Sequence, residues 1–138
     1  MFLQDNEELF QLSFNQILFD SVKRTQFFEK FYTNFIDQAP DVKAYFSKSD
    51  MQQQSKILRQ SFLYVIEFST TNKPTTRLKE LAELHSRKQL NIPPELYEHW
   101  LNAMLKTVGE INPDTDGGTI EAWREVLLPG IEYMKKHY

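Results

Sequence analysis

Apolar residues recur every three or four positions along almost the whole chain, and this periodicity is the feature that most constrains the fold. The segment 25–38 is the clearest case, because Phe27, Phe28, Phe31, Tyr32 and Phe35 form one wide stripe on a helix. No segment alternates apolar and polar residues over the length of a strand. The sequence therefore predicts an all-α domain of about seven helices.

Turn and capping residues divide the chain into these helices. We expect a first helix that carries Leu9 and Ile17, followed by helices at about 25–38, 41–46, 51–68, 77–88 and 94–108, and a last helix from 119 to beyond 131. The segment 112–118 has the composition of a loop, and Pro129 should kink or break the last helix. The candidate N-caps are Asp5 or Asn6, Ser49 or Asp50, and Thr119.

Composition narrows the class of protein. A chain of 138 residues with 11 Phe can form one domain over residues 1–138, with a core that is unusually aromatic or that lines a flat apolar ligand. The net charge of −3 and the lack of a like-charged block argue against nucleic acid and anionic membranes as partners. Without cysteine there is no disulfide, thiolate metal site or thioether-linked cofactor. With no signal peptide and no apolar run of spanning length, we expect a cytoplasmic protein.

His85 is the candidate metal ligand. It shares one helix face with Leu78 and Leu81, where another leucine would be expected. A core or rim histidine with an ordinary hydrogen-bond partner is the alternative to a ligand for a metal or haem iron. Tyr32 and Gln54 also lie on inward faces, and each alone has an ordinary explanation as a packed phenol or a solvated amide.

The order and spacing of these residues are more specific than any one of them. Tyr32, Pro40, Phe46, Gln54 and His85 follow one another at intervals that resemble those of the globin family. The chain is most similar to bacterial single-domain globins and to the haem domains of flavohaemoglobins and globin-coupled sensors. The resemblance extends from about residue 7 to residue 138, and it implies a globin fold around a haem.

The resemblance also assigns roles to individual residues. It implies His85 as the proximal iron ligand of a haem b (iron protoporphyrin IX). Tyr32, Gln54 and Leu58 would lie on the distal side of the haem. The residues that would contact the haem elsewhere are Phe46, Leu78, Leu81, Ile92 and Tyr97. Gln52 and Gln53 are alternatives to Gln54, which we prefer because its register buries more apolar surface.

Two departures from the family pattern affect the proximal side. Leu84 stands where many globins have a serine that contacts the proximal imidazole, so we expect the Leu81 carbonyl to hold His85 instead. The late glutamate of the flavohaemoglobin network is missing, because Glu132 is too early, and this argues against a peroxidase-like site. Lys48, Arg59, Arg87 and Lys88 are candidates to reach the haem propionates, with simple solvated charge as the alternative.

The resemblance implies a protein that reversibly binds oxygen, for storage or supply, with NO and CO as other possible ligands. Hydrogen-bond donors from Tyr32 and Gln54 would give tight binding and slow release. The alternatives are a nitric oxide dioxygenase, which would need a separate reductase because no dinucleotide fingerprint occurs here, and a haem-based gas sensor. A haem-free regulatory globin is disfavoured by His85 and Phe46. Both a monomer and a homodimer are compatible with the sequence.

Overall fold

The computed structural model describes residues 2–46 and 51–138, without the side chains of residues 2–5, 45, 46, 51–55, 57 and 70. The described residues form seven helices and no strand, which confirms the predicted all-α class. The helices are α1 (Phe2–Leu18), α2 (Ser21–Ile36), α3 (Pro40–Phe46), α4 (Met51–Thr71), α5 (Thr76–His85), α6 (Glu95–Ile111) and α7 (Gly117–Lys136).

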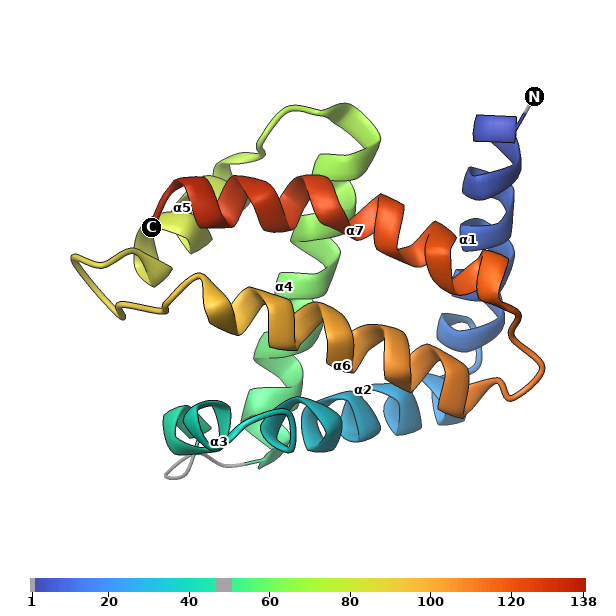
Figure 1. Cartoon of the computed structure of the whole chain (residues 1–138), viewed down its shortest axis with the longest axis horizontal. Coiled ribbons are helices and arrows are strands. Elements are labelled where there is room, and N and C mark those ends of the chain that lie inside the picture. Colours follow the sequence, from blue (N-terminus) through green and yellow to red (C-terminus); the bar gives the residue numbers. More distant parts are fainter. Residues whose placement is uncertain (1, 47–50) are drawn as a thin grey trace.

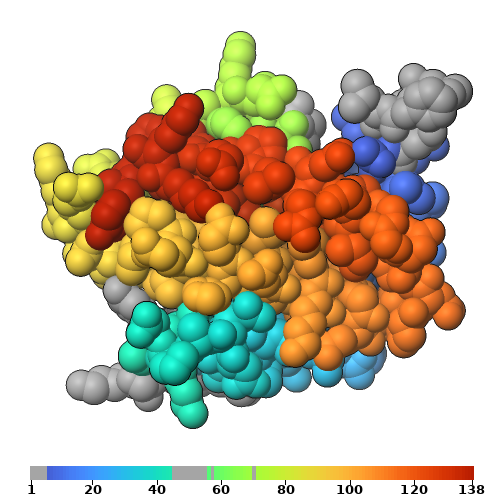
Figure 2. All heavy atoms as spheres, viewed as in Figure 1, coloured from blue at the N-terminus to red at the C-terminus, as the bar shows by residue number. Residues whose placement is uncertain are grey.

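The helices pack in crossing pairs. In Figure 1, α6 and α7 run side by side across the molecule and α4 crosses behind them. The α2 helix packs along α6 on the side away from α7, and α1 packs against α2 and the first half of α7. Figure 2 shows the side chains of α6 in contact with those of α2 and α7 along this face. The short α5 lies at one end of the bundle, where it contacts α4.

Aromatic residues fill the centre of the bundle. Trp123 and Phe62 are fully buried, and their rings stack with centroids 6.0 Å apart. Phe10 meets the Trp123 ring edge-on at 4.9 Å, and Phe27 joins the same cluster. Such pairs stabilise a core beyond their buried area, by about 0.5–1.5 kcal/mol each. Most of the phenylalanines therefore build the core itself, which is the first of the two roles that the composition allowed.

Several helix starts differ from the prediction. The α1 helix already includes Asp5 and Asn6, so neither residue is its N-cap. The α2 helix begins at Ser21 because the Asp20 carboxylate caps it by accepting from the Val22 N–H. The α7 helix begins at Gly117, and its cap is Asp116, which accepts from the backbone N–H of Thr119 at 2.8 Å. In both α2 and α7, an aspartate that precedes the expected start is the N-cap residue.

The crossing of α4 and α7 depends on a glycine. A Cβ on Gly130 would lie 2.6 Å from Val65 Cγ1 and 3.1 Å from both Val65 Cα and its carbonyl oxygen. The two backbones can approach this closely because Gly130 has no side chain. The α7 helix is continuous through Pro129, so the break that we considered there does not occur. No helix in the described part of the chain is long and apolar enough to span a membrane.

Candidate functional site

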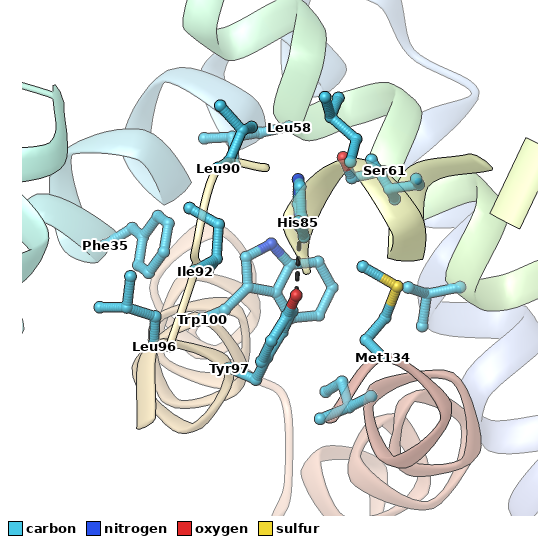
Figure 3. Close-up of a pocket in the computed structure, with 14 residues that line it drawn as sticks. Phe35, Leu58, Ser61, His85, Leu90, Ile92, Leu96, Tyr97, Trp100 and Met134 are labelled. Carbon is cyan, nitrogen blue, oxygen red and sulfur yellow. Dashed lines mark hydrogen bonds between the residues drawn. The ribbon is translucent and has the colours of Figure 1, made fainter. Parts of the chain in front are cut away.

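A largely apolar cavity of about 390 Å³ lies between α4, α5, α6 and α7. This volume is in the range of sites that bind small molecules and cofactors. Figure 3 shows side chains from all four helices, from α2 and from the α5–α6 connection converging on this space. The residues that line it are Phe35, Leu58, Ser61, Val65, Leu81, Leu84, His85, Leu90, Ile92, Leu96, Tyr97, Trp100, Ile131 and Met134.

His85 is the one imidazole among the described residues of the cavity lining, and it is the best candidate there for a metal ligand. It ends α5, whose first turn is capped by the Thr75 hydroxyl, which accepts from the Leu78 N–H. Burial lowers the pKa of His85, so its imidazole is neutral at neutral pH. Figure 3 shows one ring nitrogen directed at Tyr97 and the other directed away from it, into the cavity. A neutral imidazole nitrogen that faces an apolar cavity is a suitable ligand for a metal centre.

Tyr97 holds the other nitrogen of this imidazole. The His85 Nδ1 atom lies 3.1 Å from the Tyr97 hydroxyl oxygen. Burial raises the pKa of Tyr97, so the phenol keeps its proton and the contact is between neutral groups. When Nδ1 carries the proton and donates to the phenol, the second nitrogen has a free lone pair. The prediction that the Leu81 carbonyl holds this nitrogen is wrong, because the first turn of α6 brings the phenol to Nδ1 instead.

The connection after α5 is tied back to the end of that helix. The Ile92 N–H donates to the His85 carbonyl at 3.0 Å, and the Leu90 N–H donates to the Leu84 carbonyl at 3.0 Å. Asn91, between them, has a φ of 53°, in the left-handed region that asparagine tolerates better than most residues. This turn directs Ile92 into the cavity and leaves Leu84 and Leu90 at its rim, where they are 43% and 52% exposed.

The predicted site residues fall into three groups. His85, Leu58, Leu81, Ile92 and Tyr97 all line the cavity, so residues spread over three helices and one connection do meet. Two others are buried but are not among the lining residues, namely Tyr32, in the main core, and Leu78, in a separate cluster with Ala82 and Met134. The side chains of Phe46 and Gln54 lie outside the described residues, so their predicted roles stay predictions.

Sequence reasoning missed several lining residues that simple helical spacing could have found. Ser61 and Val65 follow Leu58 by three and seven positions, and therefore lie on the same face of α4. On α6, Trp100 follows Tyr97 by three positions and Leu96 by four, so it shares a face with each of them. Helical spacing could not have identified Ile131 and Met134 as lining residues, because their position depends on how α7 crosses the other helices.

Comparison with known proteins assigns the family. A family model for globins matches residues 29–128, which is most of the chain. This chain belongs to the globin family. A solved structure from Pseudomonas aeruginosa PAO1, described as structurally highly homologous to a human hemoglobin, has a similar fold with a TM-score of 0.84. That protein is 32% identical in sequence, over 96% of this chain and 98% of the other. No curated protein matches the chain.

The lining of the cavity is suited to the haem that the globin family implies. The imidazole of His85 supplies one metal ligand, and the remaining walls are almost entirely aliphatic or aromatic, as a flat apolar macrocycle requires. The exposed Leu84 and Leu90 mark the edge at which the cavity meets solvent.

The basic residues that we considered for the haem propionates are engaged elsewhere or exposed in this globin. The Arg59 guanidinium lies 5.9 Å from the centre of the Phe28 ring, and that of Arg87 lies 5.0 Å from the centre of the Tyr138 ring. Lys88 is exposed, and Lys48 lies outside the described residues. Among the described residues, the cavity lining includes no lysine, arginine or carboxylate.

Proposed function

We propose that this globin binds a haem b through His85 and reversibly binds oxygen, for storage or supply. The observation that carries the proposal is a neutral, partly buried imidazole with one nitrogen held by Tyr97 and the other open to an apolar cavity. The haem iron would supply the site at which a diatomic gas binds. Because the chain has no cysteine, the haem would be held without a covalent thioether link.

The protein contributes orientation, exclusion of water and hydrogen-bond donors. Tyr97 orients the imidazole, since a hydrogen bond on Nδ1 sets which nitrogen faces the metal. The apolar walls keep bulk water from the centre of the cavity. For the opposite side of the haem we assign Tyr32 and Gln54 as donors to a gas ligand with negative partial charge. This assignment rests on the family resemblance, because Tyr32 is buried in the main core and not in the cavity lining. A donor of this kind is worth about 1.5–3 kcal/mol, which slows release by about tenfold to a hundredfold.

The first test is the absorbance spectrum of the purified protein with added haem. We expect an intense haem band that is lost in His85→Ala. The matched control is His137→Ala, because His137 is the exposed C-cap residue of α7 and does not line the cavity. A haem band that survives in His85→Ala unchanged would refute the assignment of the iron ligand.

The second test concerns the ligand. Oxygen should dissociate faster from Tyr32→Phe than from the wild type, and equal rates would remove Tyr32 from its proposed role.

Nitric oxide dioxygenase activity and gas sensing are the alternatives for the same site. Sustained nitrate formation from nitric oxide with an added reductase would favour the enzyme over an oxygen carrier, because the described structure contains a single helical bundle and no reductase fold.

A further inference from the structure

The three most exposed large apolar side chains among the described residues lie within a short stretch of the chain. Phe19 is 80% exposed, Val22 is 63% exposed and Leu12 is 62% exposed. Leu12 and Phe19 are seven positions apart on one helical face, since the Phe19 N–H still donates to the Asn15 carbonyl at 3.1 Å. Single apolar side chains on a surface are ordinary, whereas a group that includes an aromatic ring indicates a contact surface.

The corner between α1 and α2 fixes the backbone from which Phe19 and Val22 project. The Asp20 carboxylate accepts from the Val22 N–H at 3.0 Å, and the Arg24 guanidinium donates to the Leu18 carbonyl at 3.0 Å. Both bonds tie the corner to itself. The two apolar side chains therefore start from a defined position, and a surface that is ordered before contact loses less entropy on binding.

A groove lies beside these side chains. It has a volume of about 560 Å³ and lies between α1, the start of α2 and the connection from α6 to α7. Leu9 and Leu12 contribute its apolar side. Two hydrogen bonds of 3.3 Å join its walls, because Lys23 Nζ donates to Asn112 Oδ1 and Asn112 Nδ2 donates to Gln16 Oε1. The groove is therefore formed within the single chain, and its volume exceeds that of a phenylalanine side chain.

The groove carries both signs of charge. Lys23 lies on its α2 wall, and Asp114 and Asp116 lie on the α6–α7 connection. Asp116 caps α7, whereas Lys23 and Asp114 form no ion pair with any residue that the structure describes. A surface that offers a projecting ring, a groove, a cation and a carboxylate is complementary to its own copy after a two-fold rotation.

We propose that the corner surface, which consists of Leu12, Phe19, Val22 and the groove beside them, binds a second copy of this chain. In the two-fold pair, Phe19 of each copy enters the groove of the other, and Lys23 of each copy faces Asp114 of the other. A different protein would have to match this shape and charge, whereas a second copy already does. Figure 1 shows the α1–α2 and α6–α7 connections at the end of the molecule opposite α5, so the pair leaves the haem cavity free. Haem-free and haem-loaded protein should therefore associate alike.

The first test is sedimentation velocity of the full chain over roughly 1 μM to 1 mM. The wild type should change from monomer to dimer as its concentration rises, with no larger species, because a two-fold contact closes on itself. Phe19→Ser should weaken the dimer by about tenfold or more. A wild type that stays monomeric over the whole range would overturn the proposal and leave the corner surface to a different partner or to solvent. A series of species larger than a dimer would overturn it as well.

Leu12→Gln and Leu63→Gln form a matched pair of variants. Both replace an exposed leucine on a helix, but Leu63 lies on α4 and does not line the groove. Leu12→Gln alone should weaken the dimer, because it places an amide where the two copies meet. Equal weakening in both variants would overturn the proposal, because it would trace the effect to surface hydrophobicity in general. Circular dichroism confirms that each variant is folded.

A mixing experiment tests the charge contacts between copies. Lys23→Glu and Asp114→Lys each place like charges across the interface, so each variant alone should dimerise more weakly than the wild type. An equimolar mixture should recover the dimer, because each copy then meets the opposite charge on the other. Within either variant the groove still carries like charges at these two positions, so only contact between two chains can produce the recovery. A mixture that associates no better than the separate variants would overturn the proposal.

Discussion

Replacing Gly130 by alanine should destabilise this globin, although the same change usually stabilises a helix. Alanine in a helix interior is favoured over glycine by about 1 kcal/mol. At Gly130, however, the new Cβ would lie 2.6 Å from Val65 Cγ1 and 3.1 Å from Val65 Cα and its carbonyl oxygen. Carbon atoms pack best at about 3.5–4.0 Å, so α4 and α7 would have to separate by a substantial part of an ångström.

Val65 cannot easily move to make room for the new Cβ atom. Val65 is β-branched and lies inside α4, where its χ1 angle is largely restricted to one rotamer. Turning it would still leave the tight contacts with its backbone. Overpacking of this kind costs about 1–3 kcal/mol, and we expect a value in the upper half of that range. After the gain in helix propensity, the net loss is about 1–2 kcal/mol, or roughly 3–10 °C in Tm for a domain of this size.

Gly109→Ala is the matched control. Gly109 also lies inside a helix, and a Cβ added there would have no neighbour within 4 Å. It should therefore stabilise the protein by about 0.5–1 kcal/mol. Thermal unfolding of both variants, followed by circular dichroism at 222 nm, gives the comparison. If Gly130→Ala raised Tm as much as Gly109→Ala, the close crossing of α4 and α7 would be refuted.

Three other variants test the site and the core. Tyr97→Phe should leave His85 Nδ1 without its partner and speed haem loss by about tenfold, measured by transfer to an excess of an acceptor protein, and unchanged transfer would mean that Tyr97 does not hold the imidazole. Because burial lowers the pKa of His85 in the folded state, the unfolded chain binds more protons below about pH 6.5. Haem-free protein should therefore lose stability as pH falls below that value, and urea titrations of His85→Gln should show a shallower loss. Ser13→Ala removes the acceptor of the Trp123 indole and should cost about 1–3 kcal/mol in the same assay, while an unchanged midpoint would argue against this hydrogen bond.

The helical class and most of the helices follow from local properties of the sequence. The aromatic stripe of α2 predicts a buried face because residues three and four apart share one side of a helix. The structure buries Phe27, Phe28 and Phe31 as expected. Leu12 on α1 is an exception, since it continues an apolar pattern and is 62% exposed. Periodicity predicts that a face is apolar, but not how much of its width a neighbouring helix will cover.

The sequence by itself determined the helical class, the order of the elements and the candidate ligand His85, because each depends on local spacing and on a family pattern read along the chain. Only the tertiary structure decided which groups meet. The Tyr97 hydroxyl reached His85 Nδ1 in place of a carbonyl from the same helix, and the Trp100 indole turned its N–H into the cavity. The first contact depends on the turn after α5, which brings α6 back to the end of α5. The close approach of α4 and α7 at Gly130 was likewise decided by tertiary structure, because packing between segments distant in sequence has no signature in local periodicity.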